Sequence, residues 1–191
     1  MKTIVKIMAS CAALTAAGAA FPQHAVHSGS GAKSAPPSSY TGQQDRAIKA
    51  LSAQETQDLL AGNGMGLSRA AELNSHPGPA HVLELQQALR LTQEQEEAST
   101  RLMTTHKNEV RRLGEQLVQA EQELDVGFAR RSIDAPQLSA LVRRIGQLQS
   151  AIRESHLQTH LTQTALLSPE QIAQYNVLRG YSAGTTSGRR P

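Results

Sequence analysis

Aromatic residues and cysteine are scarce in this sequence. Its 191 residues include no tryptophan, three tyrosines, two phenylalanines and one cysteine. Proteins that bind nucleic acids stack bases on aromatic rings and neutralise phosphates with clustered basic residues, and this sequence has no basic patch with interleaved aromatics. We therefore expect no nucleic-acid partner and no large aromatic core.

Long apolar runs are also missing, apart from one near the amino terminus. Lys2 and Lys6 precede a run of apolar and small residues that ends at residue 20, the pattern of a cleaved signal peptide. The run is too short for a transmembrane helix, so we expect no transmembrane anchor. We predict a signal peptide over residues 1–20 and export to the periplasm.

The single cysteine, Cys11, lies inside this apolar run. Residues 8–11 loosely resemble the lipid-attachment motif of lipoproteins, although Met8 fits that motif poorly and the apolar run continues past Cys11. Lipidation at Cys11 is therefore an alternative to signal cleavage after Ala19 or Ala20. Cleavage there removes the cysteine, so the exported protein has neither a disulfide nor a thiolate.

Charge and catalytic residues give no sign of an enzyme. The formal net charge is +3, and removal of Lys2 and Lys6 leaves +1. An acidic cluster, Glu94, Glu96 and Glu97, stands at the expected start of a helix, where negative charge is favourable. No serine occurs in the sequence context of a nucleophile elbow. We expect no enzymatic activity.

The remaining chain is rich in leucine and alanine, which favours long amphipathic helices. Residues 21–39 are rich in Gly, Ser, Pro and Ala, and we predict a flexible linker there. We predict a helical domain over residues 40–181 and a disordered tail over residues 182–191.

A long helical hairpin is the main feature predicted for this domain. No proline interrupts residues 93–131, and apolar residues there are spaced as in a helix packed on one side. Asp134 and Pro136 begin a second helix that runs to about residue 166. The predicted fold class is all-α, a long antiparallel helical hairpin with short additional helices. The residues expected to face inward are Leu102, His106, Val110, Leu113, Leu117, Leu124, Phe128, Leu138, Leu141, Val142, Ile145, Leu148 and Ile152.

One short motif occurs twice, at residues 91–95 and 167–171, each time at the start of an expected helix. In both copies a hydroxyl can accept a hydrogen bond from the amide three residues later, while the glutamine there reaches back, which is the capping-box arrangement. Pro169 adds the proline preferred at the first helical position. The motif residues are Leu91, Thr92, Gln95, Leu167, Ser168 and Gln171.

This double LTxxQ motif, placed around a helical hairpin behind a signal peptide, resembles the Spy/CpxP family of periplasmic helical proteins. The resemblance covers roughly residues 40–181. It implies a cradle-shaped dimer that acts as an ATP-independent periplasmic chaperone or envelope-stress protein and binds partly unfolded proteins. Related branches respond to zinc, nickel or cobalt, so the alternative is a periplasmic heavy-metal sensor or metal-binding resistance protein.

Apolar residues beyond a single stripe favour a homodimer. Leu102, Leu117, Val142, Leu157 and Leu161 are spread too widely for the narrow seam of one hairpin. Either the short helices or a second copy of the chain must cover them. We expect a second copy, joined along the hairpins.

Three histidines form a candidate metal site. The predicted turn places His160 opposite His106, with His156 about one helical turn away, so that the three imidazoles converge. His156 and His160 are four residues apart, the spacing with which one helix face offers two imidazoles to a divalent metal such as zinc, nickel, cobalt or copper. Met103 and Glu109 are further candidate ligands.

Two alternatives to this metal site remain open. Histidines in a packed seam commonly fill space and form hydrogen bonds, which needs no metal. A metal can also bind instead to His24, His27, His76 or His81. A zincin protease site is excluded, because Leu157 stands where such a site requires its general-base glutamate.

Overall fold

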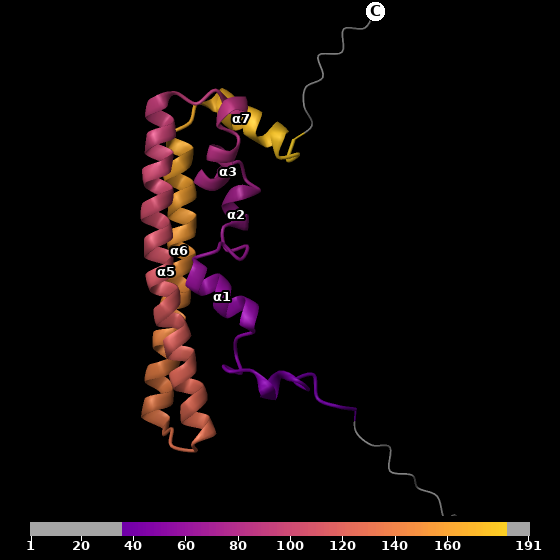
Figure 1. Cartoon of the computed structure of the whole chain (residues 1–191), viewed down its shortest axis with the longest axis vertical. Coiled ribbons are helices and arrows are strands. Elements are labelled where there is room, and N and C mark those ends of the chain that lie inside the picture. Colours follow the sequence, from indigo (N-terminus) through magenta and orange to yellow (C-terminus); the bar gives the residue numbers. More distant parts are fainter. Residues whose placement is uncertain (1–35, 183–191) are drawn as a thin grey trace, which may run out of the picture. The chain divides into compact units, whose positions relative to one another are not determined.

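Two long antiparallel helices form the largest part of the structure (Figure 1). The structure is a computed structural model and describes residues 36–182. Helix α5 (Gln93–Ala129) and helix α6 (Ala135–Ala165) lie side by side and are joined by a short turn. In that turn Arg131 has a φ of 53°. The predicted hairpin is confirmed, with both helices ending one or two residues earlier than expected.

The chain divides into two units, Met1–Ser38 and Ser39–Pro191. All the helices described below lie in the second unit. The predicted signal peptide, Cys11, His24 and His27 lie outside the described residues, as do most of the predicted linker and tail.

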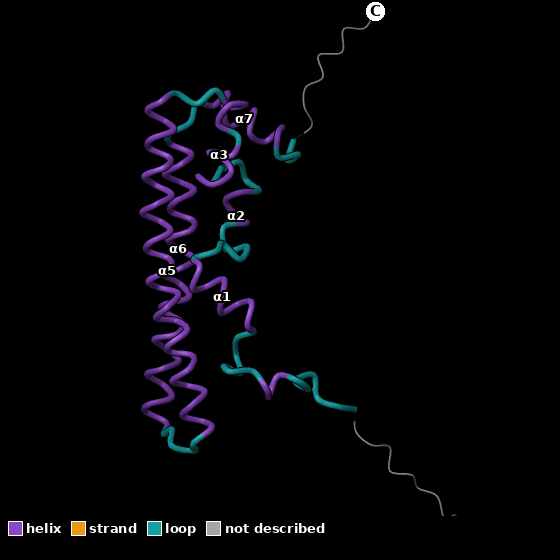
Figure 2. Tube along the Cα trace, in the orientation of Figure 1, coloured by secondary structure: helices purple, strands orange, loops and turns teal. Residues whose placement is uncertain are grey.

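Shorter helices precede and follow the hairpin. Their bounds are η1 (Gln43–Asp45), α1 (Ala53–Ala61), α2 (Arg69–Glu72), α3 (Pro79–Glu84), α4 (Gln86–Leu89) and α7 (Pro169–Leu178). Figure 2 shows helices joined by loops throughout the described chain, where the only β-pairing is an isolated bridge between Ile48 and Leu51. The described structure is therefore all-α, as predicted.

Four of the helices begin with a capping box, which explains where they start. The side chains of Ser52, Thr92, Asp134 and Ser168 each accept a hydrogen bond from the amide three residues later. In return, the Glu or Gln at that third position accepts from the amide of the capping residue. These reciprocal bonds satisfy amides that a helix start leaves without an intrahelical partner. The boxes predicted at Thr92 and Ser168 are confirmed.

Helix α1 approaches the backbone of α5 very closely. Gly114 of α5 permits this, because a Cβ at that position would overlap the carbonyl oxygen of Leu59 in α1. Helix α1 ends at Ala61 and is capped by Gly62, which has a φ of 64° and where an added Cβ would overlap the side chain of Val110. The buried apolar residues in the middle of the hairpin, here called the apolar seam, are Leu113, Leu117, Ala120, Ile145 and Ile152.

Two residues expected to face inward are instead exposed. Phe128 is 57% exposed and Val142 is 52% exposed, whereas the other predicted inward residues are buried or half-buried. Both lie near the turn, whereas Figure 1 shows α2 and α3 beside the other half of the hairpin and α1 at its middle. Two helices alone bury only one stripe of each other, so residues flanking that stripe stay exposed. None of the described helices is long and apolar enough to span a bilayer.

Candidate metal centre

A cavity of about 310 Å³ lies between the hairpin and the short helices α2 and α3. The three predicted histidines, His106, His156 and His160, all line it, and so does Met103. Glu109 does not, because it is exposed and forms an ion pair on the surface of α5. The structure thus brings the predicted histidines to one cavity and leaves one of the two further candidates outside.

The histidines of α5 and α6 touch directly. His106 Nε2 lies 3.0 Å from His156 Nδ1, and His106 Nδ1 lies 3.1 Å from Ser155 Oγ. The two rings meet edge to face, with 4.6 Å between their centroids. His106 therefore faces His156 and not His160, so the predicted register was wrong by one helical turn. Register depends on how side chains interlock along the whole seam, and the position of the turn alone does not set it.

His160 lies one turn further along α6 and contacts the segment before α3. Its Nδ1 lies 2.7 Å from the carbonyl oxygen of His76, so Nδ1–H donates and Nε2 keeps its lone pair. Gly78 leaves room for the ring, because a Cβ there would lie 2.7 Å from His160 Nε2. A hydrogen bond from the far ring nitrogen to a carbonyl oxygen is the usual way in which proteins orient a histidine ligand.

Burial keeps the facing imidazoles neutral. His156 is only 5% exposed, and burial, together with the neighbouring His106 and His160, lowers the pKa of His156 to about 4. Burial also lowers the pKa of His106. Transition metals bind the neutral form of imidazole, so acid does not compete for His156 at neutral pH.

Two polar atoms at this cavity are buried without a hydrogen-bond partner among the described residues. They are His156 Nε2 and Glu72 Oε2, and Glu72 Oε2 lies 3.7 Å from His160 Nδ1. An unsatisfied buried polar atom costs roughly 1–3 kcal/mol, so a water or an ion that pairs with it is favourable. Nothing in the sequence selects Glu72, since the pattern around it carries no metal-site spacing.

The donor types at the cavity fit a transition metal, although their present spacing does not. Imidazole nitrogen and carboxylate oxygen are ligands of zinc and of other divalent first-row metals. Within residues 36–182, however, no three His, Cys, Asp or Glu side chains are close enough to hold one metal ion together. Metal binding therefore requires side chains to move inside the cavity.

The two copies of the repeated motif contact each other and do not line the histidine cavity. Gln95 Nε2 donates to Gln171 Oε1, and Gln171 Nε2 donates to Gln95 Oε1, both at 2.9 Å. Each amide nitrogen also donates to a main-chain carbonyl oxygen. Leu167 is buried in the cluster next to this amide pair, and Leu91 packs against it. The motif therefore fastens the start of α5 to the start of α7.

Comparison with known protein families is consistent with a metal-binding cavity. Residues 59–174 match the family described as heavy-metal resistance. The chain belongs to this family. The matching segment runs from α1 into α7 and contains every residue that lines the histidine cavity. No curated protein and no solved structure matches the chain significantly.

The heavy-metal resistance family belongs to the Spy/CpxP-like superfamily of helical proteins and is typically periplasmic. The family resemblance inferred from the repeated motif is thus supported at the level of the superfamily. Of the two functions which that resemblance implied, the family match favours metal resistance or sensing over the chaperone.

Proposed function

We propose that this member of the heavy-metal resistance family binds one divalent transition metal in the histidine cavity and serves in periplasmic metal sensing or resistance. The observation that carries the proposal is the buried His156 Nε2, which has no hydrogen-bond partner in the described structure and belongs to a residue that lines the cavity. Zinc, nickel, cobalt and copper all suit imidazole ligands.

The proposed ligands are His156 Nε2, His160 and Glu72, with Met103 or water completing the coordination. A metal bound there would satisfy both His156 Nε2 and Glu72 Oε2, the two orphaned buried atoms that belong to residues lining the cavity. Three protein ligands and one position open to water form a coordination that zinc adopts in proteins. Side chains within the cavity have to move to bring these groups together, because Glu72 Oε2 now lies beside His160 Nδ1 and not beside the Nε2 that keeps its lone pair.

The contacts of His106 favour an orienting role over direct ligation. Both of its ring nitrogens already have partners, Ser155 Oγ and His156 Nδ1. In the tautomer in which His156 Nδ1–H donates to His106 Nε2, His156 Nε2 carries the free lone pair that a metal needs. Direct ligation by His106, as the sequence suggested, remains a prediction to be tested beside this role.

Isothermal titration calorimetry tests the metal site. Wild-type protein is titrated with Zn²⁺, Ni²⁺, Co²⁺ and Cu²⁺ at pH 7, beside the double variant His156→Ala/His160→Ala. We expect one metal per chain for the wild type and no binding at this site for the variant. The matched control, His24→Ala/His27→Ala, also removes two imidazoles and should bind as the wild type does.

Circular dichroism of both variants checks that the helices persist. Equal metal uptake by the wild type and by His156→Ala/His160→Ala would contradict the proposal. Loss of uptake in the control variant would instead move the site to the amino-terminal histidines. A third variant, His106→Ala, separates the two roles of His106. Loss of an orienting residue weakens metal binding by about 10–100-fold, whereas loss of a ligand also changes the coordination of the metal.

A second candidate function, binding of partly unfolded proteins, is favoured by one observation. Val126, Phe128 and Val142 leave apolar surface exposed near the turn of the hairpin. Exposed apolar groups of this kind give adaptable contacts to unfolded chains. Purified protein should then suppress aggregation of a denatured test protein at near-stoichiometric ratios, and the variant Phe128→Ser/Val142→Ser should do so less well while still binding metal. No suppression by the wild type at several-fold excess would remove this function.

We also infer a homodimer joined along the hairpins. Leu161 is 51% exposed on α6, so an apolar side chain there remains for a second copy to cover. The variant Leu161→Glu should lower the molecular mass measured by light scattering while leaving helix content unchanged by circular dichroism. A wild type that stays monomeric at tens of micromolar would exclude the dimer.

A further inference from the structure

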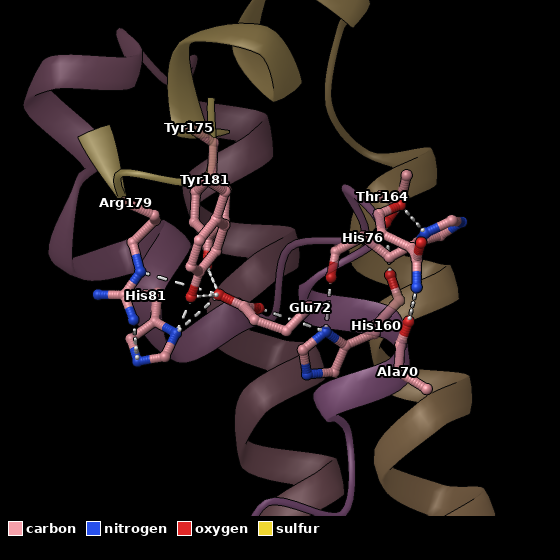
Figure 3. Close-up of polar contacts among 10 residues, drawn as sticks. Ala70, Glu72, His76, His81, His160, Thr164, Tyr175, Arg179 and Tyr181 are labelled. Atoms are coloured by element: carbon pink, nitrogen blue, oxygen red, sulfur yellow. Dashed lines mark hydrogen bonds and ion pairs between the residues drawn. The ribbon is translucent and has the colours of Figure 1, made fainter. Parts of the chain in front are cut away.

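The carboxylate of Glu72 joins the metal cavity to the last helix of the structure. Figure 3 shows it between His160 on one side and Tyr175, Arg179 and Tyr181 on the other. Glu72 Oε1 accepts hydrogen bonds from Tyr175 Oη at 2.5 Å and from Tyr181 Oη at 3.1 Å. The same oxygen lies 3.8 Å from Arg179 Nε. One oxygen of Glu72 is therefore held by residues of α7 and of the segment just after it.

The other oxygen of Glu72 has different surroundings. Glu72 Oε2 is buried and has no hydrogen bond within the described chain, and the residue lines the histidine cavity. The side chain of Glu72 as a whole is only 12% exposed. A cation in the cavity can therefore bind Oε2 without displacing the tyrosines from Oε1.

Tyr175 is the firmest of these contacts. It is fully buried, and burial together with the neighbouring Glu72 raises the pKa of its hydroxyl, which therefore stays protonated and donates. Charge-assisted hydrogen bonds to a carboxylate are about twice as strong as neutral ones. The tyrosine thus fixes the carboxylate of a helix that has only four residues and little rigidity of its own.

We propose that α7 controls the metal affinity of the cavity through Glu72, and that bound metal in turn stabilises the docking of α7. This proposal rests on the proposed function, because it takes Glu72 as a ligand of the same metal. Docked α7 keeps the Glu72 carboxylate at the cavity, so that the histidines make the movement that metal binding requires. Undocked α7 leaves the carboxylate free to turn into solvent, so the metal has to order it on binding.

The coupling is positive and reciprocal. Since metal and α7 use different oxygens of one carboxylate, each favours the conformation that the other requires. Linkage demands that the factor by which docked α7 raises metal affinity equals the factor by which metal favours docking. Outer contacts of metal ligands typically contribute 10–100-fold in affinity, which sets the expected size. In this way α7 becomes the element that responds to metal occupancy.

The first measurement compares Zn²⁺ affinity by calorimetry at pH 7. Tyr175→Phe removes one hydroxyl from Glu72 Oε1, and we expect its Kd for Zn²⁺ to be about 10–100-fold weaker than that of the wild type. The matched control is Tyr40→Phe, which removes a hydroxyl from an exposed tyrosine and should leave the Kd unchanged. Arg179→Gln is a second test variant, because its side chain is partly exposed and the substitution is easier to accommodate than one at the buried tyrosine.

The second measurement is amide hydrogen exchange in α7, with and without saturating Zn²⁺. In the wild type we expect Zn²⁺ to slow exchange of α7 amides by up to the same factor that separates the two Kd values. In Tyr175→Phe this effect of Zn²⁺ should shrink. Circular dichroism confirms that each variant is folded, and if Tyr175→Phe is not, Arg179→Gln decides the comparison.

Two results would overturn the coupling while leaving the metal site intact. One is wild-type Zn²⁺ affinity in both folded variants, and the other is exchange in α7 that does not change with Zn²⁺ in the wild type. Failure of the proposed function looks different, because the wild type itself then binds no Zn²⁺ in the histidine cavity. In that case both proposals fall together.

Discussion

The hairpin has an apolar half near its turn and a polar half near its open end, although the same two helices build both. Toward the turn, α5 and α6 meet through Leu117, Ala120 and Ile145. Toward the open end they meet through polar groups, among them Gln163 Nε2, which donates to Ser99 Oγ at 3.0 Å between fully buried residues. The buried polar residues of this half, here called the polar seam, are Ser99, His156, Thr159, His160 and Gln163.

The difference shows where stability and where function reside. Apolar burial stabilises a helix pair, and the short helix that joins this half is α1, whose Leu59 is buried against Leu117 and Ala120. Buried polar groups need partners, and His160 obtains one from His76, between α2 and α3, two helices that also line the cavity. Helices α2 and α3 therefore lie where the seam would otherwise be least stable.

The largest expected effect concerns the apolar seam. Leu117→Ala removes a side chain that is only 4% exposed, and we expect a loss of about 2–5 kcal/mol in the free energy of unfolding. Val142→Ala, at an exposed position of the same half, should change it by less than about 0.5 kcal/mol. Urea unfolding followed by circular dichroism measures both. Similar losses in the two variants would mean that Val142 is covered in solution, as a dimer interface would require.

Acid should weaken the polar half. The pKa of His156 in the folded protein is about 4, below the usual value of about 6.5, so between these values the unfolded chain binds a proton that the folded chain does not. Stability of the metal-free protein therefore falls as the pH drops through this window, by at most about 3 kcal/mol from this group. Urea unfolding at pH 7 and pH 4.5 should show a smaller difference for His156→Gln than for the wild type. An equal difference would place the acid sensitivity elsewhere.

Where α1 crosses α5, the stability of the protein should depend on Gly114. Gly114→Ala forces a Cβ into the backbone of α1 at Leu59, and we expect a loss of about 1–3 kcal/mol as the helices separate. Gly146→Ala on α6 is the control, because no described atom outside its own helix lies within 4 Å of the added Cβ. That control should gain up to about 1 kcal/mol from helix propensity. A neutral Gly114→Ala would show that α1 shifts without cost.

The smallest expected effect on stability concerns Glu121 in the apolar half, and its pH dependence is opposite to that of His156. Glu121 is buried, and burial raises the pKa of its carboxyl. A raised carboxyl pKa in the folded protein means that stability decreases as the pH rises through that pKa. Glu121→Gln should therefore raise the unfolding free energy at pH 7, within about 1 kcal/mol, and the gain should vanish in acid. A loss of stability at pH 7 would indicate that the charged carboxylate has a favourable partner.

Local signals in the sequence were sufficient for the helices themselves. Thr92 with Gln95, and Ser168 with Gln171, act on amides within their own first turn, so the start of each helix is encoded in a few consecutive residues. Helical spacing of leucines likewise predicted the hairpin. The same spacing placed Phe128 and Val142 inside, because periodicity identifies a face and does not tell whether another element covers it.

The sequence by itself determined the all-α class, the long hairpin, the repeated caps and the set of histidines on its two helices. Only the tertiary structure decided that His106 pairs with His156 and that Glu72 reaches the same cavity while bound to Tyr175. The physical reason is range. Capping and periodicity act over a few residues of one chain segment, whereas the register of two helices and the docking of a four-residue helix follow from packing between segments far apart in sequence.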